Sequence, residues 1–190
     1  LPGHSCVVIR DGATYAEQVT VRNFVNNGSS ITILADPASG LRPVVDPPAL
    51  STAAFDLRTA SVNVQGISII VDQNIPYGIY ASSAYVSLSS VTVSTSGELG
   101  IYTAGVRISS WSAISYSSVT VAGAHGYWLT GATMTTISFS SATNNSSTRY
   151  PFFLDGVKNN AFSVTFGSNT HSSGSGLYAL GSDTNTVTQS

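Results

Sequence analysis

Apolar and polar residues alternate in short stretches along the whole chain. Alternation over three to five residues, rich in Val and Ile, predicts β-strands with one buried face. No window of a dozen residues has helical periodicity, and Gly, Ser, Asn and Asp separate the stretches as turn formers. The sequence therefore predicts an all-β protein. The alternating stretches include Val19-Thr20-Val21, Ile31-Thr32-Ile33, Ile67-Ser68-Ile69, Val91-Thr92-Val93, Val119-Thr120-Val121, Ile137-Ser138-Phe139, Phe162-Ser163-Val164 and Val187-Thr188-Gln189.

A second pattern, usually a glycine followed by two bulky residues, recurs at a nearly constant spacing. Successive copies are 24, 22, 26, 25 and 25 residues apart. Strands this short cannot bury a face alone, but stacked coils pair each strand with its equivalent in the next coil, about 4.8 Å away. The period predicts a right-handed parallel β-helix of roughly six to eight coils of 22–26 residues, whereas a β-sandwich would need no fixed period. The copies begin at Ala54, Gly78, Gly100, Gly126, Pro151 and Gly176.

The repeat predicts a single β-helix domain over residues 1–190, with less regular N-terminal coils in 1–54 and regular repeats in 55–190. The chain opens at Leu1 without a methionine and stops on a strand of an unfinished coil. We expect it to be a segment of a longer protein, or to stack on neighbouring subunits, since solenoids normally end in polar caps. No apolar run reaches the roughly 18 residues that a membrane span requires.

The repeat also predicts which side chains face in and which face out. If the first bulky residue of each copy is interior, the next one points outward. An exterior column of this kind is either a docking surface for polysaccharide or a partner protein, or an intramolecular stack covered by a loop such as 140–150. The expected interior stack is Phe55, Ile79, Ile101, Tyr127, Phe152 and Leu177. The outward positions are Asp56 and the candidate ligand-binding residues Tyr80, Tyr102, Trp128, Phe153 and Tyr178.

Composition narrows the range of partners. Hydrophobic residues make up 42% and charged residues 8%, with polarity coming from 32 Ser and 20 Thr. The formal net charge of −2 leaves no basic footprint for nucleic acid. Cys6 is the only cysteine, which rules out an internal disulfide and a cysteine-based metal site.

Two segments resemble a known family. The Gly12-Ala13-Thr14-Tyr15-Ala16-Glu17-Gln18-Val19 segment is similar to the first coil of pectin-lyase-like right-handed β-helix proteins, and Asp183-Thr184-Asn185-Thr186-Val187 looks like one of their repeats. That superfamily includes pectin-degrading enzymes, epimerases, phage tailspikes and large bacterial surface proteins, so the resemblance specifies fold better than function. The low charge and the Ser/Thr richness look most like the surface proteins, which implies a secreted or cell-surface location.

The resemblance implies which catalytic and metal-binding residues an enzyme of this family would contain. Its polysaccharide lyases hold calcium in an acidic cluster beside an arginine base, but here seven Asp and two Glu are scattered singly. The best candidate for such an acidic cluster is the pair Asp56 and Asp72, beside Arg58. His125 superficially echoes the Gly-His-Gly of polygalacturonases without the paired carboxylates, and we interpret it as a turn residue. We therefore expect no catalytic residues, no metal site and no cofactor.

Two functional hypotheses remain. The first is a non-catalytic structural and adhesive module whose exterior contacts polysaccharide or neighbouring subunits. The alternative is a carbohydrate-active enzyme of the pectin-lyase type, acting on uronic-acid polymers as a lyase, hydrolase or esterase, or a remnant of one.

Overall fold

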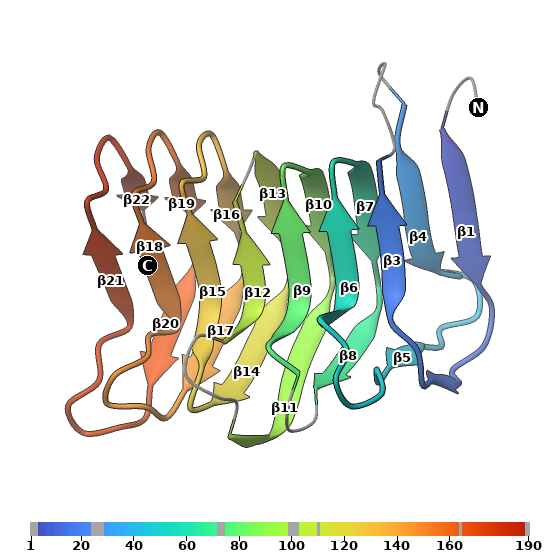
Figure 1. Ribbon diagram of the computed structural model, residues 1–190, viewed down its shortest axis with the longest axis horizontal. Helices are drawn as coiled ribbons and strands as arrows, with labels where there is room; N and C mark the ends of the chain where they lie inside the picture. Colours follow the sequence, from blue (N-terminus) through green and yellow to red (C-terminus); the bar gives the residue numbers. More distant parts are fainter. Residues whose placement is uncertain are drawn as a thin grey trace.

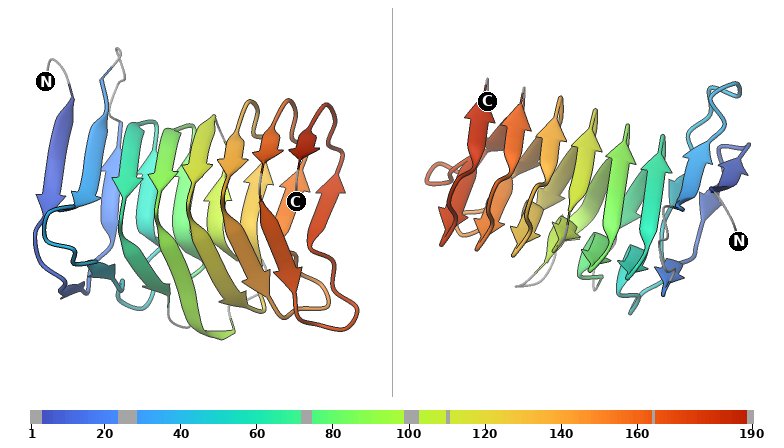
Figure 2. Two further views of the ribbon diagram at one scale, coloured as in Figure 1. Left: turned by 180° about the vertical axis from the view of Figure 1, so that it is seen from behind. Right: turned by 90° about the horizontal axis from the view of Figure 1, so that it is seen from above.

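The computed structural model describes residues 4–23, 29–71, 75–98, 103–109, 111–163 and 165–188. Within these ranges all regular elements are β-strands, which wind into a solenoid of about seven turns (Figure 1). The strands form three parallel sheets, in which each strand pairs with its equivalent in the next turn. Figure 2 shows the turns stacked along one axis, with the two termini at opposite ends. The predicted all-β parallel solenoid is confirmed.

Each turn contributes up to one strand to each sheet. Sheet A contains β1 (Ser5–Ile9), β4 (Ile31–Ala35), β7 (Ser61–Gln65), β10 (Tyr85–Ser89), β13 (Ser112–Ser115), β16 (Thr136–Ser138), β19 (Ala161–Ser163) and β22 (Thr186–Thr188). Sheet B contains β2 (Thr14–Tyr15), β5 (Val44–Val45), β8 (Ser68–Val71), β11 (Thr92–Glu98), β14 (Ser118–Ala122), β17 (Ser141–Asn144) and β20 (Phe166–Asn169). Sheet C contains β3 (Val19–Arg22), β6 (Ala53–Arg58), β9 (Tyr77–Ser82), β12 (Ala104–Ile108), β15 (His125–Thr130), β18 (Phe152–Asp155) and β21 (Leu177–Leu180).

The predicted interior stack lies on sheet C. Phe55, Ile79 and Tyr127 are fully buried, and Phe152 is 2% exposed. Leu177 occupies the same position in the last described strand of the sheet, where it is 40% exposed. Ile101 lies outside the described residues, and the strand register gives its place in that turn to Val106. Among the described residues no helix is long and apolar enough to cross a membrane.

The repeated glycine has a steric cause. A Cβ atom on Gly78 would lie 2.6 Å from the Gly105 carbonyl oxygen and 2.6 Å from Val93 Cγ1. A Cβ on Gly105 would lie 2.3 Å from Val119 Cγ1. Sheet C thus passes against sheet B where no side chain fits. The motif copy in the third regular coil is accordingly Gly105-Val106-Arg107, and its predicted start at Gly100 is wrong.

The alternating stretches that follow successive glycine motifs belong to two different sheets. The alternations that contain Ile69, Val93 and Val119 lie in sheet B, whereas those of Ile137 and Phe162 lie in sheet A. They fall at similar distances after the glycine motif because the corner between sheets C and A changes length along the solenoid. It spans residues 83–84 after β9 but 131–135 after β15 and 156–160 after β18.

Phe139, predicted to be a strand residue, is instead a corner residue. It has φ 47°, is 51% exposed, and stacks on Tyr116 with ring centroids 5.1 Å apart. The remaining members of these alternations, Val164 and Gln189, lie outside the described residues.

The longer corners carry an asparagine ladder. Asn160 is 1% exposed, and its Oδ1 accepts a hydrogen bond from the Thr135 backbone N–H at 2.7 Å. Asn185 Oδ1 accepts in turn from the Asn160 N–H at 3.0 Å. Asn160 and Asn185 thus have equivalent roles in successive corners, because each side chain accepts a hydrogen bond from a backbone N–H of the preceding coil.

Candidate functional site

The candidate site is the exterior face of sheet C. Strand register places one outward residue of each turn in a single column. Tyr102 was predicted to belong to this column, but it lies outside the described residues and Arg107 occupies the position in that turn. In chain order the column is Thr20, Asp56, Tyr80, Arg107, Trp128, Phe153 and Tyr178.

The N-terminal part of the column is an ion-pair cluster. The Asp56 carboxylate forms ion pairs with Arg22 and with Arg58, whose Nε lies 2.7 Å from Asp56 Oδ1. The Asp56 side chain is fully buried, while those of Arg22 and Arg58 are 45% and 40% exposed. Hydrogen bonding to Asp56 raises the pKa of the Arg58 guanidinium above its ordinary value. Asp56 thus faces outward, as predicted, beneath two arginines. Asp72, its proposed acidic neighbour, lies outside the described residues.

Arg107 separates the two parts of the column. Its guanidinium lies 4.6 Å from the ring centroid of Trp128 and 5.5 Å from that of Tyr80. Its Nη1 donates a hydrogen bond to the Tyr77 hydroxyl at 2.9 Å. These cation–π contacts join Tyr80 to the aromatic residues beyond. Arg107 is absent from the predicted column because the motif of this coil starts at Gly105, five residues after its predicted start at Gly100.

The C-terminal part of the column is aromatic. The ring centroids of Trp128 and Phe153 are 5.7 Å apart, and those of Phe153 and Tyr178 are 5.9 Å apart. Trp128 and Phe153 are partly exposed, and Tyr178 is 40% exposed. The register thus places four of the five predicted residues, those other than Tyr102, in one outward column.

His125 flanks these rings. It begins β15 and is 2% exposed, so its interpretation as a turn residue is wrong. Its ring stacks on Phe153 with centroids 4.4 Å apart, and Nδ1 accepts a hydrogen bond from the Tyr150 N–H at 3.1 Å. Burial, reinforced by the nearby Arg149 charge, lowers the pKa of His125 to about 4. The imidazole is therefore neutral at pH 7, with its proton on Nε2.

A loop forms one side of the site. Residues 145–151 connect β17 to β18, and Tyr150 from this loop stacks on Tyr178 with centroids 4.5 Å apart. Asn169 Nδ2 holds the loop by donating to the carbonyl oxygens of Ser146, at 2.8 Å, and Arg149, at 3.2 Å. The aromatic rings therefore stack partly within the molecule, while the loop leaves part of their surface open.

Between the loop and the strands lies a surface groove of about 320 Å³. Trp128, Phe153 and Tyr178 line it together with Asp155, which follows Phe153 by two residues and so lies on the same face of β18. Within the described part of the chain, the Asp155 carboxylate has no hydrogen bond or ion pair. The remaining lining residues are His125, Thr148, Arg149 and Tyr150.

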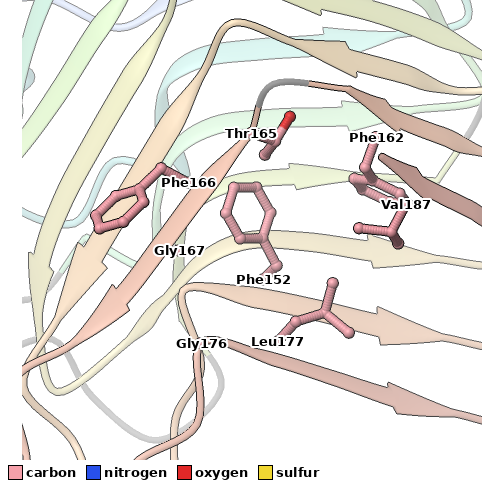
Figure 3. A pocket seen from close by; sticks show the side chains of 8 residues that line it. All are labelled: Phe152, Phe162, Thr165, Phe166, Gly167, Gly176, Leu177 and Val187. Carbon is pink, nitrogen blue, oxygen red and sulfur yellow. The ribbon is translucent and has the colours of Figure 1, made fainter. Parts of the chain in front are cut away.

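A second cavity, of about 250 Å³, has a different character. It lies at the C-terminal end of the core, where Phe152, Phe162, Leu177 and Val187 converge (Figure 3). Its lining contains no charged side chain, so it is an open end of the hydrophobic core. Among the described residues, no group of three or more His, Cys, Asp or Glu side chains is placed to hold a metal ion.

Comparison of the chain with protein-family models, with curated proteins and with solved structures gives no significant match. Function must therefore be inferred from the geometry of the groove and of the column beside it.

Proposed function

We propose that the chain is a non-catalytic structural and adhesive β-solenoid module of a secreted or cell-surface protein, and that it binds polysaccharide on the exterior of sheet C. Within this proposal it is a relative of the pectin-lyase-like surface proteins that its first coil resembles. The observation that carries the proposal is the groove itself, where partly exposed rings form a floor and polar side chains stand on both sides.

The physical basis is the complementarity of flat rings and sugar rings. The C–H-rich face of a sugar packs on an aromatic ring, while its hydroxyl groups need hydrogen-bond partners at the rim. Burying one aromatic ring contributes roughly 1–3 kcal/mol by area alone. The rings of Trp128, Phe153 and Tyr178 are already held by stacking, so little conformational entropy is lost on binding.

The rigidity of the solenoid supports the proposed adhesive role. In each sheet, every described strand except the two at the edges pairs with a parallel strand on both sides. This pairing makes the solenoid a rigid support for the groove.

The direct test is polysaccharide binding by variants that remove a ring. Tyr178→Ala and Trp128→Ala should each weaken binding to the polymers retained on a glycan array by about tenfold, as expected for the loss of one buried ring. Tyr85→Ala is the matched control, since Tyr85 is a 49% exposed tyrosine on sheet A.

The control should bind like the wild-type protein, and urea unfolding should show whether each variant is folded. Absence of any polysaccharide binding by the folded wild-type chain would refute the proposal, as would equal losses in Tyr178→Ala and Tyr85→Ala.

A further inference from the structure

The groove has two chemically different walls. Asp155 lies on the strand side, in a second outward column between Thr130 and Leu180 of the neighbouring turns. Arg149 and Thr148 lie on the loop side, next to Tyr150. A ligand lying on the aromatic floor would therefore meet a carboxylate along one edge, and a guanidinium and a hydroxyl along the other.

The charges in the groove balance. Asp155 contributes one negative charge and Arg149 one positive charge, while His125 is neutral at pH 7 because burial lowers its pKa. Arg107, the next cation along the column, does not line the groove, since it lies against Trp128 and donates to Tyr77. A groove with no net charge gives no electrostatic advantage to a charged ligand.

The carboxylate of Asp155 has unused hydrogen-bonding capacity. An ionised carboxylate accepts hydrogen bonds through two oxygens and donates none, so it is satisfied by two adjacent hydroxyl groups. A ligand carboxylate in the same place would face like-charge repulsion and would lose solvation without compensation. Asp155 therefore distinguishes neutral sugars from uronic acids.

We infer that the groove binds a neutral glycosyl unit with vicinal hydroxyl groups, with the sugar face on Phe153 and Tyr178 and the hydroxyl pair on Asp155. This inference rests on the proposed polysaccharide binding and defines the class of polymer. Neutral hexose polymers are the preferred ligands, and uronic-acid polymers bind more weakly because the Asp155 carboxylate on the strand-side wall repels their carboxylates.

The experiment compares neutral and acidic polymers by isothermal titration calorimetry at pH 7. Galactan and glucan oligosaccharides are the neutral probes, and oligogalacturonate and alginate oligosaccharides are the acidic ones. The wild-type protein should bind at least one neutral probe about tenfold more tightly than either acidic probe, the effect of one charge-assisted contact.

Asp155→Asn removes the charge and keeps the shape of the side chain. It should weaken binding of the neutral probe by about tenfold and reduce the discrimination against uronates, because an amide offers one acceptor oxygen in place of two. Asp183→Asn is the matched control, since Asp183 is an exposed aspartate whose partner is Lys158 and which does not line the groove.

Three results would overturn the inference: preference for a uronate probe, unchanged affinity in Asp155→Asn, or an equal loss in Asp183→Asn. If uronates bind and Tyr178→Ala abolishes that binding, polysaccharide binding stands and the neutral-sugar assignment fails. If no probe of either class binds, both fail.

Discussion

Asp56 and Asp155 are two aspartates on the same exterior face of sheet C, but their environments differ. Asp56 is fully buried between Arg22 and Arg58, so its charge is neutralised within the molecule. Asp155 is partly exposed, and no described residue pairs with its carboxylate. The carboxylate in the N-terminal part of this face is therefore paired within the molecule, and the Asp155 carboxylate in the C-terminal part stays available to a ligand.

The difference arises from the residues that surround each aspartate on this face of the sheet. Arg58 follows Asp56 by two residues on β6, and Arg22 is paired with Arg58 on the adjacent strand β3. Around Asp155, the neighbouring turns place Thr130 and Leu180 at its level, and neither carries a charge. Charged side chains two residues further along the same strand and the adjacent strand therefore decide whether a carboxylate on this face is neutralised within the molecule or free to bind.

The largest expected effect on stability is at the ion-pair cluster in the N-terminal part of this face. Asp56→Ala should lower the free energy of unfolding by about 3 kcal/mol, because it removes two charge-assisted hydrogen bonds from a buried position. The loss stays moderate because both guanidinium groups can return to water. Urea unfolding at pH 7 measures it.

Asp155→Ala is the control for this comparison. It should change the same free energy by less than about 0.5 kcal/mol, as for a surface substitution. Equal effects at the two aspartates would contradict the distinction between the two parts.

The second effect is acid sensitivity in the C-terminal part. The His125 pKa is about 4, whereas the unfolded chain binds this proton near the ordinary value of 6.5. The unfolded state thus binds more protons between these values, and stability falls as pH drops through this window. From pH 7 to pH 4, His125 should contribute a loss of about 2–3 kcal/mol.

Urea unfolding at pH 7, 5.5 and 4 tests this, with His125→Gln as the variant that cannot titrate. The wild-type protein should lose more stability than the variant, and parallel pH profiles would exclude His125 as the acid-sensitive group.

The smallest of these effects concerns the five-residue corners after β15 and β18, which are longer than the two-residue corners after β6 and β9. Asn160→Ala should cost about 2 kcal/mol, since Asn160 accepts from the Thr135 N–H and donates to the Lys158 and Ala132 carbonyl oxygens. Thr136→Ala, at an exposed outward position of β16, should be nearly neutral. Comparable midpoints for the two variants in thermal unfolding would mean that the ladder adds no stability.

The sequence alone was sufficient to predict the solenoid. Its period, its strand alternation and the inward–outward parity identified the buried Phe55, Ile79, Tyr127 and Phe152 correctly. These features repeat in every coil, and the two-residue period of a strand depends only on backbone geometry. Binding by the aromatic column remains a prediction.

The tertiary structure alone decided which residues share the groove. The coil containing β12 differs in length from its neighbours, and its register follows from the contact of Gly105 with Val119, which put Arg107 in the column. Asp155 follows its aromatic neighbour Phe153 by two residues in sequence, but the loop that carries Arg149 and Tyr150 is held at the groove by His125 and by Asn169 from the next coil. Such contacts join residues far apart in the chain without any periodic signal, so no pattern of residue types reveals them.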